Sequence, residues 1–290
     1  MATELIGCVT ACVITRNEEK TIERALSSLT WADELVVIDA YSTDRTVAIA
    51  QKFTNKIYSN EWKGFTDQRN FALANCNADW VFFLDSDEEA SVDLGKQLLK
   101  IAQDDPSRHP NCYSIKRIEY FLGKELHFGP GNPSHQWRFF KRKGVRFEGE
   151  VHEFPRFEGG VGAIEEPIYH NPNLGIDRFL VKLNHYTTLE ALDRFGMGQR
   201  TSLLHAFGTF FTTFIKNGIR YRGLLNGKEG FVLTVLESVS RVVRHLKLWT
   251  FWKVYEGKIK IDLGITLPRP GSVMAPTHED LNRPQIQSRQ

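Results

Sequence analysis

The 290-residue sequence predicts an α/β fold, with a doubly wound, mostly parallel sheet and a C-terminal helical extension. Three observations support this class. Strand-like and helix-like spacings of apolar residues alternate along the first part of the chain, with short links between them. Strand-like segments separated by Gly- and Pro-containing turns follow from Cys112, and helical spacing dominates after Gly175. Short alternating elements of this kind form parallel sheets that helices cover on both faces.

The first part of the chain contains four short runs of β-branched and aromatic residues, which predict strands at 8–14, 34–39, 56–59 and 80–85. Between them, apolar residues at helical spacing predict helices at 18–29, 44–53 and 68–75. In an open α/β sheet, ligands bind beside the carboxyl ends of the strands. The polar segments that directly follow these runs are therefore the candidates for a functional site.

The remainder of the chain predicts strands at 112–121, 136–141, 145–151 and 163–169, and helices at 176–195, 201–216 and 231–255. From residue 262 the chain is rich in proline and poor in apolar residues, which predicts an extended or disordered tail. We therefore expect three parts: a main domain at 1–172, a basic amphipathic helical region at 173–261 and a Pro-rich tail at 262–290.

The net charge of +2 excludes a chain-wide electrostatic footprint for nucleic acid, and no nucleic-acid-binding motif is present. This balance hides an asymmetry, because residues 182–260 contain thirteen basic and five acidic residues, a net charge of +8. The four cysteines lack the CxxC spacing of a zinc site and are too few for a disulfide scaffold. The sequence shows no secretory signal and no apolar run of about eighteen residues, so we expect a cytoplasmic protein without a spanning helix.

The tripeptide Asp85-Ser86-Asp87 follows directly after the apolar run WVFFL. Two carboxylates at this spacing, at the exit of a buried strand, can share a divalent cation, which prefers oxygen ligands and the company of phosphate. The alternative is a pair of solvated acids in a turn. The tripeptide alone does not decide between a cation site and a solvated turn. The polar residues that follow the neighbouring strands are needed for that decision.

Polar residues also follow the other expected strands. Thr15 and Glu18 come after the first strand, Asp39 ends the second, and Arg69 lies in the third expected helix. These residue types suit a nucleoside diphosphate, because a carboxylate can accept hydrogen bonds from a base or ribose and an arginine can pair with phosphate. Helix capping is the alternative for Glu18 and its neighbours, and capping is compatible with ligand binding.

Four sequence runs in this order carry a family resemblance: VITRNEE, VVIDAYSTDRT, QRNFAL and WVFFLDSDE. Together they resemble the inverting family 2 glycosyltransferases, which have a GT-A fold. The run RFFKRKGVRFEGEVHE at 138–153 and the later YHNP resemble the branch that includes lipopolysaccharide core glucosyltransferases. The resemblance implies that residues 1–172 form a GT-A catalytic domain.

The resemblance also implies roles for single residues. A nucleotide-sugar donor would contact residues at the strand ends: Thr15, Glu18, Asp39, Arg69, Asp85 and Ser86. A divalent cation, Mn²⁺ or Mg²⁺, would bind mainly to Asp87, with Asp85 close by, and would stabilise the charge on the leaving nucleotide. Some GT-A enzymes complete this site with a later histidine, so His170 is a candidate ligand. A hydrogen-bonded structural histidine is the alternative.

Inverting transfer needs a carboxylate that deprotonates the acceptor hydroxyl. We expect this base to be Glu153, because the pair His152-Glu153 matches the family pattern, and Glu150 is the second candidate. In a strand, Glu148 and Glu150 would share one face and Glu153 would lie on the other. Glu148 and Glu150 could instead be solvent-facing acids of a strand.

The basic half of the chain allows two interpretations. Its helices, rich in Phe and Trp, could pack on the catalytic domain, or they could dock on an anionic membrane surface. The sequence thus predicts a metal-dependent inverting transfer of a hexose, such as glucose, from a UDP-sugar to a glycan or a lipid-linked acceptor such as lipopolysaccharide core. We expect a peripheral location on the cytoplasmic face of the inner membrane. A non-catalytic nucleotide-sugar-binding or scaffold protein is the alternative, and the oligomeric state is left open.

Overall fold

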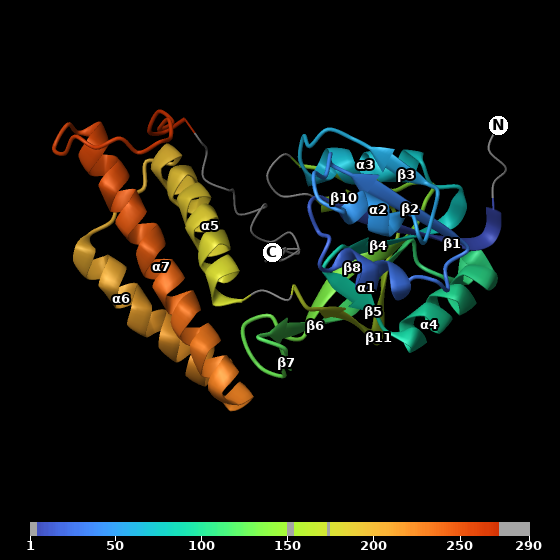
Figure 1. The fold of residues 1–290 in the computed structure, drawn as a ribbon. Helices are drawn as coiled ribbons and strands as arrows, with labels where there is room; N and C mark the ends of the chain where they lie inside the picture. The colour runs from blue at the N-terminus through green and yellow to red at the C-terminus, as the bar shows by residue number, and fades with distance from the viewer. Residues whose placement is uncertain (1–4, 150–153, 173–174, 273–290) are drawn as a thin grey trace. The chain divides into compact units, whose positions relative to one another are not determined.

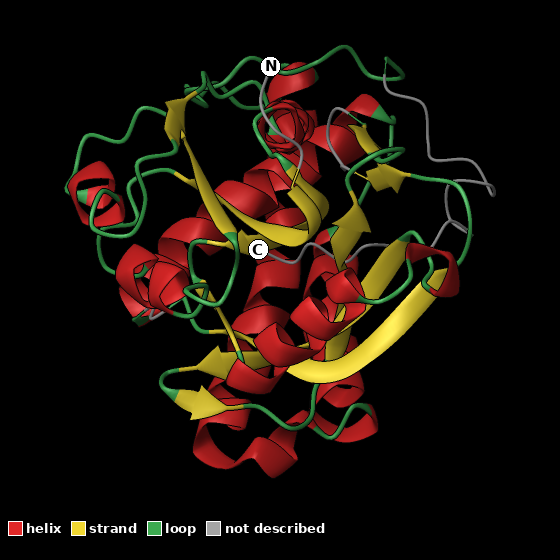
Figure 2. Cartoon of the chain, turned by 90° about the vertical axis from the view of Figure 1, so that its right-hand side faces the viewer, coloured by secondary structure: helices red, strands yellow, loops and turns green. Residues whose placement is uncertain are grey.

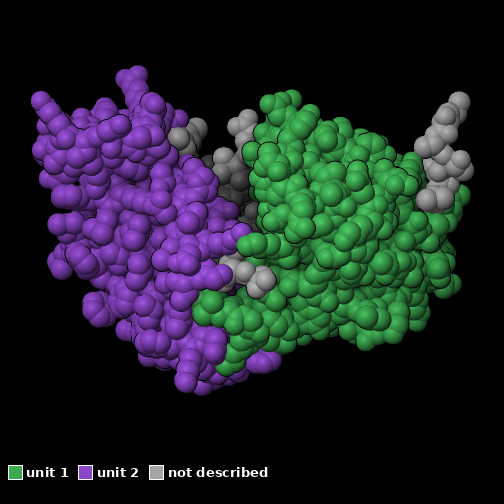
Figure 3. Space-filling view, viewed as in Figure 1, with its two compact units in different colours: residues 1–125, 133–173, 286–290 green, residues 126–132, 174–285 purple. Residues whose placement is uncertain are grey.

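The computed structural model describes residues 5–149, 154–172 and 175–272, and it divides the chain into two compact units. Within the described residues, the first unit contains 5–125, 133–149 and 154–172, and the second contains 126–132 and 175–272 (Figures 1 and 3). The short segment 126–132 thus belongs with the C-terminal helices, although it lies in the middle of the expected main domain.

The main sheet of the first unit follows one strand order: β3 (Ile57–Ser59), β2 (Glu34–Asp39), β1 (Leu5–Thr15), β4 (Ala78–Asp85), β8 (Ser134–Lys141), β6 (Cys112–Phe121), β11 (Val161–His170) and β5 (Glu88–Ala90). The strands from β3 to β4 are parallel, and so is the pair β6 and β11. Strand β8 runs antiparallel between β4 and β6, and β5 runs antiparallel to β11. The sheet is therefore mixed and mostly parallel, and it confirms the predicted α/β class.

Helices cover both faces of this sheet (Figure 2). The alternation along β1 shows why, since Val9, Ala11 and Val13 enter one core and Cys12 and Ile14 enter the other. The first core is closed by α1 (Ile22–Ser27), α2 (Thr46–Ala50) and α4 (Val92–Gln103), and the second by α3 (Phe65–Ala74). The two-residue strand β7 (Lys124–Glu125) pairs antiparallel with the end of β6.

The expected elements of this unit are present, but several are shorter than predicted. Helix α1 starts four residues after Glu18, because the carbonyl of Glu18 accepts the N–H groups of Thr21 and Ile22 in a separate turn. The strand expected at 145–151 is β9 (Arg146–Glu148), which pairs with β10 (Phe154–Arg156). Helix α4 was not predicted. Its Ser91 cap, which accepts the N–H of Leu94, and its apolar spacing are the signals that could have found it.

The second unit contains α5 (Ile176–Gly196), α6 (Leu203–Phe214) and α7 (Gly227–Tyr255), which confirm the three predicted helices. Helix α7 packs against both α5 and α6 (Figure 1). The core between α5 and α7 consists of Ala191, Phe195, Leu248 and Phe251, and Leu263 and Leu267 of the following segment pack against it. Among the described residues, no helix is both long and apolar enough to cross a membrane.

The basic residues of α7 mostly join the helices of this unit to one another. Arg244 is buried and pairs with Glu190 of α5 at 2.7 Å, and Arg241 lies 3.5 Å from the same carboxylate. The Lys247 ammonium donates to Asn184 and to two threonine hydroxyls of α5. These cations therefore hold α5 to α7, and the sequence alone did not distinguish them from cations on an outer surface.

The turn between α6 and α7 is tightly packed. Helix α6 continues as a π-helical turn (Ile215–Arg220), and a 3₁₀ turn (Gly223–Asn226) precedes α7. The Asn226 side chain accepts the N–H groups of His127 and Phe128 and donates to the Phe128 carbonyl. These three hydrogen bonds fasten the segment 126–132 to the helical unit.

Gly230, in the first turn of α7, faces the Gly223 carbonyl so closely that a Cβ there would lie 2.2 Å from its oxygen. We expect Gly230→Ala to lower the free energy of unfolding by about 1–3 kcal/mol, because backbone must move to admit the methyl group. Gly208 in α6 is the matched control, since a Cβ at that position meets no atom within 4 Å. Gly208→Ala should be neutral or stabilise by up to about 1 kcal/mol. Calorimetric unfolding measures the stability of both variants. Equal stabilities of Gly230→Ala and Gly208→Ala would contradict the close packing of Gly230 as the cause.

Candidate functional site

The carboxyl ends of β1 and β2 place two buried polar side chains side by side. Thr15 and Asp39 occupy paired positions in the sheet register and are 3% and 2% exposed. One Asp39 oxygen accepts the N–H of Ser42 at 2.9 Å. The other oxygen, Oδ1, and the Thr15 hydroxyl are buried without a hydrogen-bond partner among the described residues. Because buried polar atoms are rarely left unpaired, the pair is suited to receive a ligand.

The loops after β1 and β2 are joined to each other by side chains. The Asn17 carboxamide oxygen accepts the N–H of Thr43 at 2.7 Å, and the Thr46 hydroxyl accepts the N–H of Glu18 at 2.8 Å. The Glu18 carboxylate itself accepts the Thr21 hydroxyl proton at 2.8 Å. The Glu18 carboxylate therefore bonds to a side-chain hydroxyl and does not cap α1, which has no side-chain cap.

The Asp85 carboxylate, at the end of β4, is paired with two arginines. Both nitrogens of the Arg138 fork contact its two oxygens, at 3.2 and 2.5 Å, and Arg69 lies 3.5 Å away. Burial alone would raise the pKa of Asp85, but the charges of Arg138 and Arg69 outweigh it and hold the pKa well below its usual range. Asp85 is therefore a charged carboxylate whose two oxygens are both engaged by protein cations.

Glu88 lies behind this pair and is fully buried. One of its oxygens contacts Arg138 at 2.9 Å and Arg117 at 3.2 Å, and the other accepts the N–H of Asp85 at 3.0 Å. Glu88 therefore fixes the backbone from which Asp85 and Ser86 project. Glu88, Arg117 and Arg138 were not predicted as site residues. Both arginines lie in expected strands among other polar residues, so the sequence pattern did not single them out.

The Asp87 carboxylate contacts His170. The His170 Nε2 lies 3.3 Å from an Asp87 oxygen, and its Nδ1 lies 2.5 Å from Glu119 of β6. Burial would lower the pKa of His170, but its hydrogen bonds to Asp87 and Glu119 raise the pKa to about 10. A carboxylate on one imidazole nitrogen and a second ligand group near the other is the usual environment of a metal-binding histidine.

The structure brings together some of the predicted metal ligands. Asp87 and His170 can converge on one ion, whereas Asp85 is held by Arg138. Within the described ranges, no group of three His, Cys, Asp or Glu side chains is arranged to hold a metal ion. The residues present fit a Mg²⁺- or Mn²⁺-type site in which the protein supplies one or two ligands and substrate phosphates supply others.

Arg69 connects the strand ends to the β9–β10 hairpin. Its guanidinium lies 5.1 Å from the Phe83 ring and 5.4 Å from the Phe147 ring. The next residue, Asn70, exchanges two hydrogen bonds with the backbone of Phe147, at 2.8 and 2.9 Å. Helix α3 therefore fixes the hairpin beside Asp85.

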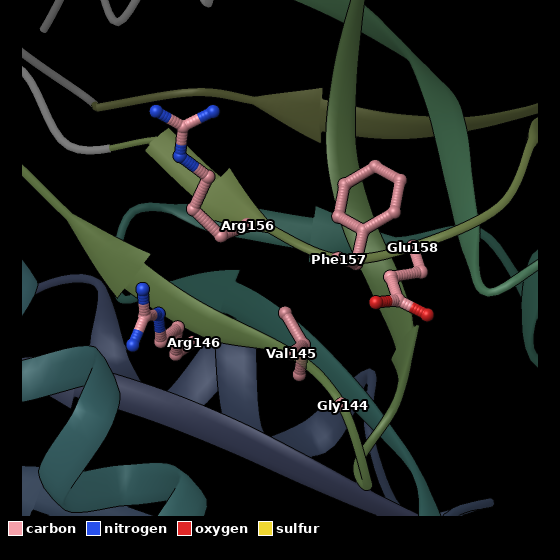
Figure 4. Close-up of a pocket in the computed structure, with 6 residues that line it drawn as sticks. All are labelled: Gly144, Val145, Arg146, Arg156, Phe157 and Glu158. Carbon is pink, nitrogen blue, oxygen red and sulfur yellow. The ribbon is translucent and has the colours of Figure 1, made fainter.

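The two candidate bases, Glu150 and Glu153, lie outside the described residues, in the chain between β9 and β10. Glu148, just before them, is partly exposed and pairs with Arg146 at 2.5 Å and Arg156 at 3.0 Å. These arginines occupy paired register positions of the two strands. They border a separate pocket of about 390 Å³ whose remaining lining residues are Gly144, Val145, Phe157 and Glu158 (Figure 4). This pocket shares no lining residue with the strand-end site.

A protein-family model described as "Glycosyl transferase family 2" matches residues 10–158, about half of the chain. The match runs from the second half of β1 through β4 and the Asp85–Asp87 turn to the paired strands β9 and β10. The chain belongs to glycosyl transferase family 2. This membership confirms the family expected from the sequence motifs, and it identifies the protein as a glycosyltransferase rather than a non-catalytic binding protein.

Named relatives agree with the family. An uncharacterized glycosyltransferase of Rickettsia conorii is 29% identical over 253 residues, which cover 83% of this chain and 89% of the relative. The lipopolysaccharide core biosynthesis glycosyltransferase LpsC of Rhizobium meliloti is 28% identical over 254 residues, covering 82% and 93%. Among solved structures, residues 1–349 of S. aureus TarS in complex with UDP match with a TM-score of 0.41 at 16% identity, covering 90% and 97%.

We expect Arg138→Met to lower the free energy of unfolding by about 3–5 kcal/mol, because the carboxylates of Asp85 and Glu88 each lose an arginine partner. Arg146→Met is the matched control, since the Arg146 pair with Glu148 is largely exposed and contributes about 0–1 kcal/mol. Urea denaturation of both variants compares them. A loss for Arg138→Met no larger than for the control would contradict the structural role of the buried cluster.

Proposed function

We propose that this family 2 glycosyltransferase binds a UDP-sugar at the carboxyl ends of β1, β2 and β4. The supporting observation is the pair of buried oxygens on Thr15 and Asp39 that have no partner among the described residues. A carboxylate oxygen in this position can accept the N3–H of a uracil ring, and the hydroxyl can bond to the base or ribose. Glu18 and Ser86 flank the nucleoside, and Arg69 faces its phosphate side.

We further propose that Asp87 and His170 hold a Mg²⁺ or Mn²⁺ ion together with the diphosphate of the donor. Such an ion neutralises the charge that develops on the departing nucleotide. The carboxylate of Glu119 orients His170 for this role, and the ion would replace the proton that His170 otherwise carries. Asp85, neutralised by Arg138, then contributes to the donor site as a fixed hydrogen-bond acceptor near the ribose.

For the transfer step, we propose Glu153 as the general base, with Glu150 as the alternative. The base takes the proton of an acceptor hydroxyl, whose oxygen attacks the anomeric carbon while the bond to the diphosphate breaks, so the configuration inverts. The anchoring of β9 to α3 by Asn70 supports this assignment, because α3 also carries Arg69 next to Asp85. General-base catalysis contributes about 10²–10⁴-fold to such reactions.

We propose a glycan or lipid-linked acceptor such as lipopolysaccharide core, with glucose as the transferred hexose. The similarity to LpsC of Rhizobium meliloti supports this acceptor class. In this proposal residues 1–172 form the catalytic domain, 173–261 the basic helical extension and 262–290 a tail. A lipid-linked acceptor would place the enzyme peripherally on the cytoplasmic face of the inner membrane.

Calorimetric titration with UDP, with and without Mn²⁺, tests the donor and metal sites separately. Asp39→Asn should weaken UDP binding about 10- to 100-fold under both conditions, because a charge-assisted hydrogen bond to the base is lost. Asp87→Asn should remove the enhancement by Mn²⁺ and leave binding without metal unchanged.

Asp93→Asn is the matched control, since Asp93 lies exposed in α4 and pairs only with Lys96 among the described residues. It should bind UDP as the unmodified protein does. Unchanged UDP affinity in Asp39→Asn would contradict the nucleoside site, and an intact Mn²⁺ effect in Asp87→Asn would contradict the metal site. Stronger binding of GDP than of UDP would overturn the choice of base.

Glu153→Gln should reduce transfer from UDP-glucose to a lipopolysaccharide-core acceptor by at least about 10²-fold and leave the UDP affinity unchanged, because only the base is lost. Release of UDP measures the rate. Glu148→Gln is the matched control, and its rate should stay close to that of the unmodified enzyme. Unchanged turnover in Glu153→Gln would exclude this residue, and a comparable loss in Glu150→Gln alone would assign the base to Glu150.

A further inference from the structure

The helix α6 and the turns that follow it expose a continuous apolar stripe. Its members recur at spacings of three or four residues along α6 and the π-helical turn, and one more lies in the 3₁₀ turn: Leu204, Phe207, Phe211, Ile215, Ile219 and Leu225. Leu204 is 86% exposed and Phe211 is 66% exposed. Single exposed apolar residues are common, but a contiguous stripe of large ones marks an interaction surface.

The stripe faces away from the helix that packs on α6. Ala206 is fully buried, and Phe214 meets the Phe231 ring of α7 edge-on at 6.2 Å. Helix α6 is thus apolar on two sides, and α7 covers only one of them. The remaining side is exposed.

Cations gather at the C-terminal end of the stripe. Four basic residues are exposed there: Lys216, Arg220, Arg222 and Lys228. The stretch 203–228 contains no Asp or Glu, and none of these four cations forms an ion pair with a described carboxylate. An exposed apolar face next to exposed cations that form no ion pair with a described carboxylate is complementary to a surface with negative headgroups above an apolar interior.

We propose that the stripe on α6, together with these four cations, docks this enzyme on an anionic lipid bilayer. The helix would lie in the plane of the interface, with the phenylalanine rings among the acyl chains and the cations at the headgroups. This inference deepens the proposed function, because it supplies the surface by which the enzyme reaches a lipid-linked acceptor. Vesicle binding is measured without donor or acceptor, so its failure and the failure of the transferase proposal are distinguishable.

Flotation of the full chain with vesicles tests the stripe. The double variant Phe207→Gln/Phe211→Gln should bind vesicles of phosphatidylglycerol and phosphatidylcholine about tenfold or more weakly, since two rings that would insert among the acyl chains are lost. Both positions are exposed, so the fold should be unaffected. Val181→Gln/Leu189→Gln, on exposed positions of α5, is the matched control and should bind as the unmodified chain does. An equal loss in both variants would overturn the assignment to α6.

The cations are tested with the same vesicles. Lys216→Gln/Arg220→Gln should weaken binding about 25-fold, at about fivefold per cation, and leave binding to pure phosphatidylcholine unchanged. Lys96→Gln/Arg108→Gln removes the same charge from exposed positions of the first unit and should have little effect. The proposal is wrong if the unmodified chain binds no vesicles. If the chain binds no vesicles but forms a dimer that Phe207→Gln/Phe211→Gln abolishes, the stripe is an interface between two copies.

Discussion

The fully buried carboxylate of Glu88 is the constraint on which the site depends. A carboxylate removed from water is stable only when cations and hydrogen-bond donors surround it. Arg138 of β8, Arg117 of β6 and the backbone N–H of Asp85 at the end of β4 supply these partners. Glu88 itself lies in β5, so one carboxylate ties four strands together at the edge of the sheet where the donor is proposed to bind. That attachment holds the backbone N–H of Asp85 in place.

The charged side chains around Glu88, Asp85 and His170 form a cluster that is balanced in formal charge. With His170 protonated, it contains four cations and four anions: Arg69, Arg117, Arg138, His170, Asp85, Asp87, Glu88 and Glu119. A divalent ion that replaces the proton of His170 adds one positive charge, and a diphosphate brings compensating negative charge. The metal and the nucleotide are therefore expected to bind better together than separately. Because Arg138 pairs with Asp85, the proposed metal site relies on Asp87 rather than Asp85.

Much of this arrangement follows from local sequence. The strands β1, β2 and β4 and the polar residues at their ends are encoded within a few consecutive positions, so Thr15, Asp39 and Asp85 could be found from pattern alone. The pairing of Asp85 with Arg138 could not, because it joins residues 53 positions apart and requires β8 to insert antiparallel between β4 and β6. Likewise, the sequence distributes cations along the helical half but does not say that Arg244 and Lys247 are used inside the unit.

Helix α6 shows why amphipathic periodicity identifies a helix more readily than its partner. The apolar residues of 203–214 cover more of the helix than one neighbour can bury, and α7 takes the side that contains Ala206 and Phe214. The pattern alone left open whether the apolar residues pack inside the protein or dock on a membrane, whereas the structure divides them into a packed side and an exposed side. An exposed stripe that runs the length of the helix, with cations at only one end, favours a partner that is flat, extended and negatively charged. A lipid bilayer meets all three requirements, whereas a second copy of this stripe would bring like charges close together unless the two helices ran antiparallel.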